Sequence, residues 1–167
     1  MALPSSERPM EGGSPARGRP GSEAIVLIAD VVRSKGDQVV TTPPESTVRT
    51  LIGLLDQHRI GALVVSTDGR TIQGIVSERD VVRRLHRDGA AVLDQTVADI
   101  MTTQVRTCSP EDNLEQTAHV MTEARVRHLP VVTDGQLVAI ISIGDVVKHR
   151  IDELQVERDQ LVDYIHR

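Results

Sequence analysis

Two kinds of hydrophobic pattern alternate along this chain, and their order occurs twice. Four short aliphatic runs are rich in β-branched residues and end at glycine, aspartate or serine, which is typical of strands. They cover residues 61–66, 71–76, 128–133 and 136–141. The segments around them carry apolar residues at helical spacing. We therefore predict a unit of order β-α-β-β-α that is repeated in tandem.

The two copies also share their turn and cap residues. Residues 39–45 align with 105–111, and the Thr-Asp-Gly at 67–69 aligns with the same three residues at 133–135. The Asp-Gly pairs predict a tight hairpin turn between the two strands of each copy. The expected N-caps of the helices before these hairpins are Ser46 or Thr47 and Asp112 or Asn113.

The last helices of the two copies differ in length. Gly89 predicts the end of this helix in the first copy, whereas the second copy continues at helical spacing to the end of the chain. Its apolar positions are Ile143, Val147, Ile151, Leu154, Leu161 and Ile165. Such a stripe needs a cover, for which the candidates are a second chain and the chain's own tandem domain. We expect a homodimer.

These patterns divide the chain into four parts. Residues 1–22 are rich in proline, glycine and serine without periodicity, and we predict a disordered tail there. The first repeat is expected at 23–89, the second at 90–150 and a C-terminal helix extension at 151–167. The expected fold class is mixed α/β of the α+β type, with the two repeats packed as a pseudo-two-fold pair.

Composition and charge exclude several functions. The net charge of −5 disfavours a general electrostatic hold on DNA or anionic lipid, and Tyr164 as the only aromatic residue rules out base stacking on aromatic side chains. Cys108 is the only cysteine, so it can form no intramolecular disulfide, and we expect it to be inert packing. No stretch approaches the roughly 18 apolar residues of a membrane span. The first 22 residues lack the apolar core of a secretory signal, so we expect a cytoplasmic protein.

Catalytic and metal-binding patterns are missing from the sequence. The six histidines are scattered without metal-ligand spacing. No Walker loop, GxSxG elbow, HExxH motif or pair of catalytic acids is present. We therefore expect a protein that is not an enzyme and that requires no metal or cofactor.

The most informative feature is the junction that closes each copy, where a predicted strand passes into a helix at Ser-x-x-Asp. The junction residues are Ser77 and Asp80 in the first copy and Ser142 and Asp145 in the second. The pair can be a capping box, in which serine and acid satisfy the start of the helix. Alternatively, the carboxylate can accept hydrogen bonds from a ribose cis-diol while the helix N-terminus attracts a phosphate. Both roles can hold at once.

The tandem unit resembles a pair of CBS domains, the Bateman module. The resemblance rests on Asp-Ile-Met-Thr at 99–102, Arg-His-Leu-Pro-Val-Val at 127–132 and the closing Gly-x-x-Ser-x-x-Asp, and it covers residues 25–150. Family members bind AMP, ADP, ATP, S-adenosylmethionine or sometimes NADH between the two copies. The resemblance thus implies a regulatory adenine-nucleotide sensor that signals to an unknown protein target. The rival hypothesis is a ligand-free dimerisation scaffold.

Carried over by position, the family's ligand contacts fall on both junctions, on the segments before the first helices and on the starts of the central strands. The implied ligand-binding residues are Thr41, Thr42, Ile60, Ala62, Ser77, Arg79, Asp80, Thr107, Val126, His128, Leu129, Pro130, Ser142 and Asp145.

The two implied sites are expected to differ in affinity, with the first copy stronger. That copy has Gly74, where backbone can approach a ligand closely, and Arg79 beside the expected phosphate position. The second copy lacks both, and its cation is expected from Arg125, Arg127 or His128.

Overall fold

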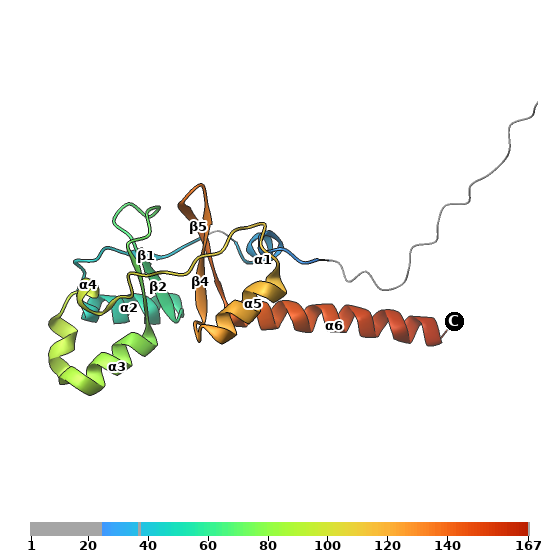
Figure 1. Ribbon diagram of the computed structural model, residues 1–167. Helices are drawn as coiled ribbons and strands as arrows, with labels where there is room; N and C mark the ends of the chain where they lie inside the picture. Colours follow the sequence, from blue (N-terminus) through green and yellow to red (C-terminus); the bar gives the residue numbers. More distant parts are fainter. Residues whose placement is uncertain (1–24, 37, 167) are drawn as a thin grey trace, which may run out of the picture.

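A computed structural model describes residues 25–36 and 38–166, so the predicted tail at 1–22 lies outside the described residues. The first part of the chain forms α1 (Ile28–Lys35), β1 (Thr41–Thr42), α2 (Val48–His58), β2 (Ala62–Val65), β3 (Gly74–Ser77) and α3 (Glu78–Asp88). The second part forms the 3-10 helix η1 (Gly89–Asp94), α4 (Val97–Ile100), α5 (Leu114–Glu123), β4 (His128–Thr133), β5 (Gln136–Ser142) and α6 (Ile143–Ile165). This is the predicted mixed α/β order, with the long C-terminal helix in place (Figure 1).

Each copy builds its own small sheet. In the first, β2 pairs in parallel with β1 and antiparallel with β3. In the second, β4 pairs antiparallel with β5, and the predicted leading strand is reduced to a single parallel bridge between Cys108 and Val131. The short extended piece predicted to end at Thr107 does not lengthen into a strand, because Pro130, at the position of Val64 in the first copy, has no N–H to donate to a longer ladder.

The hairpin prediction is confirmed in one copy only. Asp134 and Gly135 both have positive φ, 52° and 75°, and join β4 directly to β5. In the first copy the prediction of a tight turn was wrong, because residues 66–73 form an open loop between β2 and β3. The Asp68 carboxylate organises that loop by accepting hydrogen bonds from the backbone N–H groups of Arg70 and Thr71 at 2.8 and 2.6 Å.

Two hydrophobic cores lie under the two sheets, and each takes its leading helix from the other repeat. Ile28 and Val31 of α1 pack into the core beneath β4 and β5. Val97 and Ile100 of α4 pack into the core beneath β2 and β3. The predicted boundaries at 23–89 and 90–150 therefore remain a prediction about sequence repeats, while the packing interlocks the two halves.

The lone cysteine is part of the second core. Cys108 is 7% exposed, and burial, followed by the carboxylate of Asp112, raises the pKa of its thiol to about 12. A protonated thiol is a poor nucleophile, so the predicted packing role is confirmed.

Gly74 is needed for the segment that joins the repeats. A Cβ at this position would lie 2.6 Å from Met101 Sδ and 3.0 Å from the Thr102 carbonyl oxygen. Ile75 and Thr102 exchange backbone hydrogen bonds of 2.9 Å, which fixes this close approach. The glycine was expected to make room for a ligand, but it makes room for the linker.

We expect Gly74→Ala to lower the free energy of unfolding by about 1–3 kcal/mol, because the new methyl group overpacks against backbone that is held in place. Urea denaturation measures the change. Gly53→Ala is the matched control: its Cβ would meet nothing within 4 Å and it lies within α2, so that variant is expected to be slightly more stable. Equal stabilities of the two variants would contradict the packing argument.

Helix α6 leaves the body of the molecule after its first turns (Figure 1). Among its predicted stripe residues, Val147, Ile151, Leu154, Leu161 and Ile165 are between 49% and 76% exposed. Within one chain, therefore, the described tandem domain does not cover the stripe.

No described helix is long and apolar enough to cross a membrane.

Candidate functional site

A cavity of about 490 Å³ opens where the two repeats meet, beside the junction of β3 and α3. Its walls come from four segments: the start of β2, the β3–α3 junction, the linker after α4 and the turn before β4. These contribute Gly61, Ala62, Ile75, Ser77, Glu78, Arg79, Asp80, Arg83, Thr102, Gln104, Val105, Arg106 and residues 124–129. The volume falls within the range of small-molecule sites.

The Ser-x-x-Asp junction caps helix α3 and faces this cavity at the same time. Asp80 Oδ2 accepts hydrogen bonds from the Ser77 backbone N–H at 2.8 Å and from Ser77 Oγ at 2.6 Å. Both bonds use one carboxylate oxygen. The other, Oδ1, accepts no hydrogen bond from the described residues, although Asp80 lines the cavity. The capping interpretation is confirmed, and it leaves a carboxylate oxygen free for a ligand.

Five arginines line the same cavity, in a chain whose net charge is −5. They are Arg79, Arg83, Arg106, Arg125 and Arg127. Within the described part of the chain, no carboxylate lies within 4.0 Å of any of the five. Their only acidic neighbours in the wall are Glu78 and Asp80, so the cavity concentrates unneutralised positive charge.

His128 lies in this wall, and charged side chains from both repeats influence the pKa of its imidazole. Burial, and then the nearby Lys35 and Arg127, lower the pKa of its imidazole, while Asp145 and Glu78 act against them. Neutral imidazole is therefore favoured in the folded protein. The expectation that His128 supplies a cation is wrong at neutral pH.

The lowered pKa of His128 predicts a pH-dependent stability. Between its usual value of 6.5 and its lower folded value, the unfolded chain binds more protons, so the free energy of unfolding falls as the pH drops below 6.5. We expect His128→Gln to lose less stability than the wild type between pH 7.5 and 5.5, as measured by urea denaturation. Exposed His86→Gln is the control, and the wild-type slope in His128→Gln would disprove this origin.

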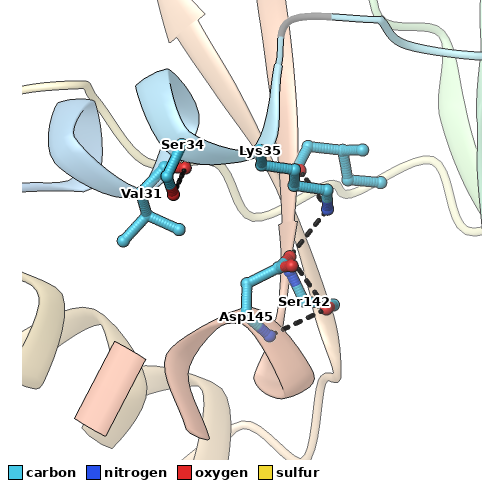
Figure 2. Close-up of polar contacts among 6 residues, drawn as sticks. Val31, Ser34, Lys35, Ser142 and Asp145 are labelled. Carbon is cyan, nitrogen blue, oxygen red and sulfur yellow. Dashed lines mark hydrogen bonds and ion pairs between the residues drawn. The ribbon is translucent and has the colours of Figure 1, made fainter. Parts of the chain in front are cut away.

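The second junction has a different environment. Asp145 Oδ2 accepts hydrogen bonds from the Ser142 N–H at 2.7 Å, from Ser142 Oγ at 2.9 Å and from Lys35 Nζ at 2.7 Å. Figure 2 shows the lysine reaching from the end of α1 to the start of α6. Burial pushes the pKa of Asp145 up, but the hydrogen bonds from Lys35 and Ser142 outweigh it and hold the pKa below its usual value.

The structure brings together half of the predicted ligand-binding residues. Those that line the cavity are Ala62, Ser77, Arg79, Asp80, Val126, His128 and Leu129. Those that do not line it are Thr41, Thr42, Ile60, Thr107, Pro130, Ser142 and Asp145. Thr42 is fully buried, and its hydroxyl has no hydrogen-bond partner among the described residues.

The cations were assigned to the wrong copy. Arg125 and Arg127 were expected beside Asp145, but they line the cavity of Asp80, and the cation at Asp145 is Lys35. Arg83, Gln104 and Arg106 were missed. The repeat offered no signal for Lys35, because it lies in the stretch at 33–38, where the first copy has three extra residues and the alignment is not defined.

No three histidine, cysteine, aspartate or glutamate side chains in the described ranges are grouped as a metal ion would require. The polar chemistry of the site therefore rests on the carboxylate of Asp80 and the guanidinium groups.

Comparison with known proteins places the chain in a family. The sequence signature of the CBS domain matches residues 28–87 and 97–152. "CBS domain-containing protein CBSX3, mitochondrial" of Arabidopsis thaliana is 33% identical over 163 residues, which cover 93% of this chain and 79% of the plant protein. Its location belongs to that protein, and the cytoplasmic location of this chain stays a prediction.

Solved structures share the architecture. The CBS-domain containing protein ATU1752 from Agrobacterium tumefaciens is 42% identical with a TM-score of 0.72, over 75% of this chain and 99% of that protein. The CBS domain pair of protein MJ0100, solved with 5′-methylthioadenosine and S-adenosyl-L-methionine, has a TM-score of 0.69 over 78% and 99% of the two chains at 21% identity, which shows the shared fold. Since the signature covers both repeats, the protein belongs to the CBS-domain family, as a regulatory pair of two CBS domains.

Proposed function

We propose that this protein is a sensor of adenine nucleotides that binds its ligand in the cavity beside Asp80. The observation that carries the proposal is the free Asp80 Oδ1 in the wall of a cavity lined by five arginines without ion-pair partners among the described residues. A ribose cis-diol donates to a carboxylate oxygen, and phosphate groups bind guanidinium forks. The two features recognise the two polar parts of one nucleotide.

The charge of the cavity distinguishes between the candidate ligands. AMP, ADP and ATP bring increasing negative charge, whereas S-adenosylmethionine brings a sulfonium cation. Five guanidinium groups against two carboxylates favour a polyphosphate. We therefore rank ATP and ADP above AMP, and AMP above S-adenosylmethionine, although a distant structural relative was solved with the last.

The cavity also provides a route from binding to regulation. Arg79 and Arg83 belong to helix α3 of the first repeat, while Arg125 and Arg127 precede the central strand of the second. A phosphate chain held from both sides stabilises one relative orientation of the repeats. Its effect on a partner protein cannot exceed its differential affinity for the two orientations.

A thermal-shift titration with ATP, ADP, AMP, S-adenosylmethionine and inorganic triphosphate tests the proposal. A ligand that binds only the folded chain raises the melting temperature by mass action, and we expect the largest shift with ATP. No shift with any nucleotide at millimolar concentration would favour the alternative, a ligand-free interaction scaffold.

We also propose that the apolar stripe of α6 is covered by α6 of a second copy. The stripe continues after Val147 at Ile151, Leu154, Arg158 and Leu161, which alternates steps of three and four residues as paired helices do. The helix extends free of its own chain (Figure 1), so a second helix can lie along it. Arg158 interrupts the stripe and pairs with Asp159 at 2.7 Å.

Removing residues 152–167 is therefore expected to convert a dimer into a monomer, because it deletes half of the six apolar stripe residues. Light scattering after size-exclusion chromatography measures the mass. Leu154→Asp should have the same effect within the full chain, whereas Gln160→Asp, beside the stripe, should leave the mass unchanged. An unchanged mass after truncation would disprove the helix pairing.

A further inference from the structure

The Asp145 junction, where the family resemblance places a second cleft, carries a contact that the Asp80 junction lacks. Lys35 Nζ donates to Asp145 Oδ2 at 2.7 Å and to the Ile140 carbonyl oxygen at 3.1 Å (Figure 2). Asp145 is the counterpart of Asp80 in the repeat, and the segment that follows α4, residues 102–104, contains no lysine. Gln104 lines the open cavity and makes no ion pair with Asp80, because an amide carries no charge.

The position of Lys35 is fixed from both ends. It is the last residue of α1, whose Ile28 and Val31 are buried in the second core. Gly36 follows with a φ of 92°, which turns the chain away toward the first repeat. The ammonium group therefore comes from a helix anchored on the same core as the carboxylate it contacts.

The contact neutralises the carboxylate that a ribose would approach at the second junction. Asp145 Oδ2 already accepts two hydrogen bonds from Ser142, and the ammonium group is its third donor. Asp145 Oδ1, like Asp80 Oδ1, accepts no hydrogen bond from the described residues, but a diol that approaches it meets an ammonium group bound to the neighbouring oxygen, whereas no charged donor of the described residues contacts Asp80.

We propose that Lys35 is a built-in occupant of the second cleft, which holds Asp145 in place of a ribose and limits the chain to one nucleotide at the Asp80 cavity. This inference rests on the proposed nucleotide-binding function. Lys35 and Asp145 are 38% and 21% exposed, so the ion pair contributes little to stability. Its consequence is selectivity between the two Ser-x-x-Asp junctions, in addition to the selectivity that the five arginines of the Asp80 cavity provide.

The test is the number of ATP molecules bound per full-length chain, measured by isothermal titration calorimetry. The wild type is expected to bind one. Lys35→Gln, which keeps a polar side chain without the charge, and Lys35→Ala are expected to bind two, the second at least about tenfold more tightly than any residual second binding to the wild type. Lys35→Arg keeps the charge and should still bind one.

The added site is assigned by a second substitution. Asp145→Asn in the Lys35→Gln background should remove the second site and leave the first, with the folded state checked by thermal unfolding. Two sites in the wild type, or one site in both Lys35→Gln and Lys35→Ala, would overturn the inference while the proposed function stands. Absence of binding in every variant would overturn both.

Discussion

Replacing Asp80 by asparagine is expected to weaken ATP binding by about 10- to 100-fold, the usual cost of losing a hydrogen bond to a charged group. The asparagine carbonyl can still accept the two bonds from Ser77 that cap α3, so the helix start is preserved. What is lost is the charged Oδ1 that faces the cavity. Isothermal titration calorimetry of the purified variant measures the change.

Asp145→Asn is the matched control for this prediction. It changes the same atom in the same capping arrangement, so its effect on folding should be similar. Lys35 already binds the Asp145 carboxylate, however, so the loss of this carboxylate in Asp145→Asn should leave ATP affinity nearly unchanged. Equal losses in the two variants would show that the two junctions contribute alike, and that the asymmetry between the clefts was misjudged.

Local signals in the sequence predicted the elements well. Thr47 and Asn113 cap α2 and α5 with side chains that accept from the N–H three residues on, and Gly89 ends α3 with a positive φ of 66°. Each of these features depends only on residues within one helical turn. The tandem repeat presents the N-cap of its first helix twice, which makes the pattern easier to identify. The same locality made the capping role of Ser77 and Asp80 predictable before the fold was known, while their ligand-binding role stays a prediction.

Contacts between distant segments were not readable in this way. The pair of Lys35 and Asp145 joins residues 110 positions apart, and it exists only because α1 packs on the core of the other repeat. Arg125 and Arg127 likewise line the cavity of Asp80, which belongs to the other repeat. Periodicity indicates which face of a helix or strand is buried, but it does not indicate on which repeat's core that face packs.

The second large effect is expected from the arginines. We predict that Arg79→Gln combined with Arg127→Gln weakens ATP binding by about 100-fold, because each substitution removes a charge-assisted hydrogen bond worth about a factor of ten or more. AMP, with one phosphate group, should lose less. The loss should also flatten the dependence of ATP affinity on salt, since fewer charges remain to be screened.

The control for this prediction is Arg70→Gln, which removes an exposed arginine that does not line the cavity. It makes the net charge of −5 more negative by the same step as each single substitution, so it separates a general charge effect from a site effect. Two results would show that the cavity arginines do not bind the phosphate chain. One is a loss of ATP affinity in Arg70→Gln as large as in Arg79→Gln alone, and the other is an equal loss of AMP and ATP affinity in the double variant. Arg79 and Arg127 belong to opposite repeats. If the double variant loses more binding free energy than the two single variants lose in sum, the ligand couples the repeats.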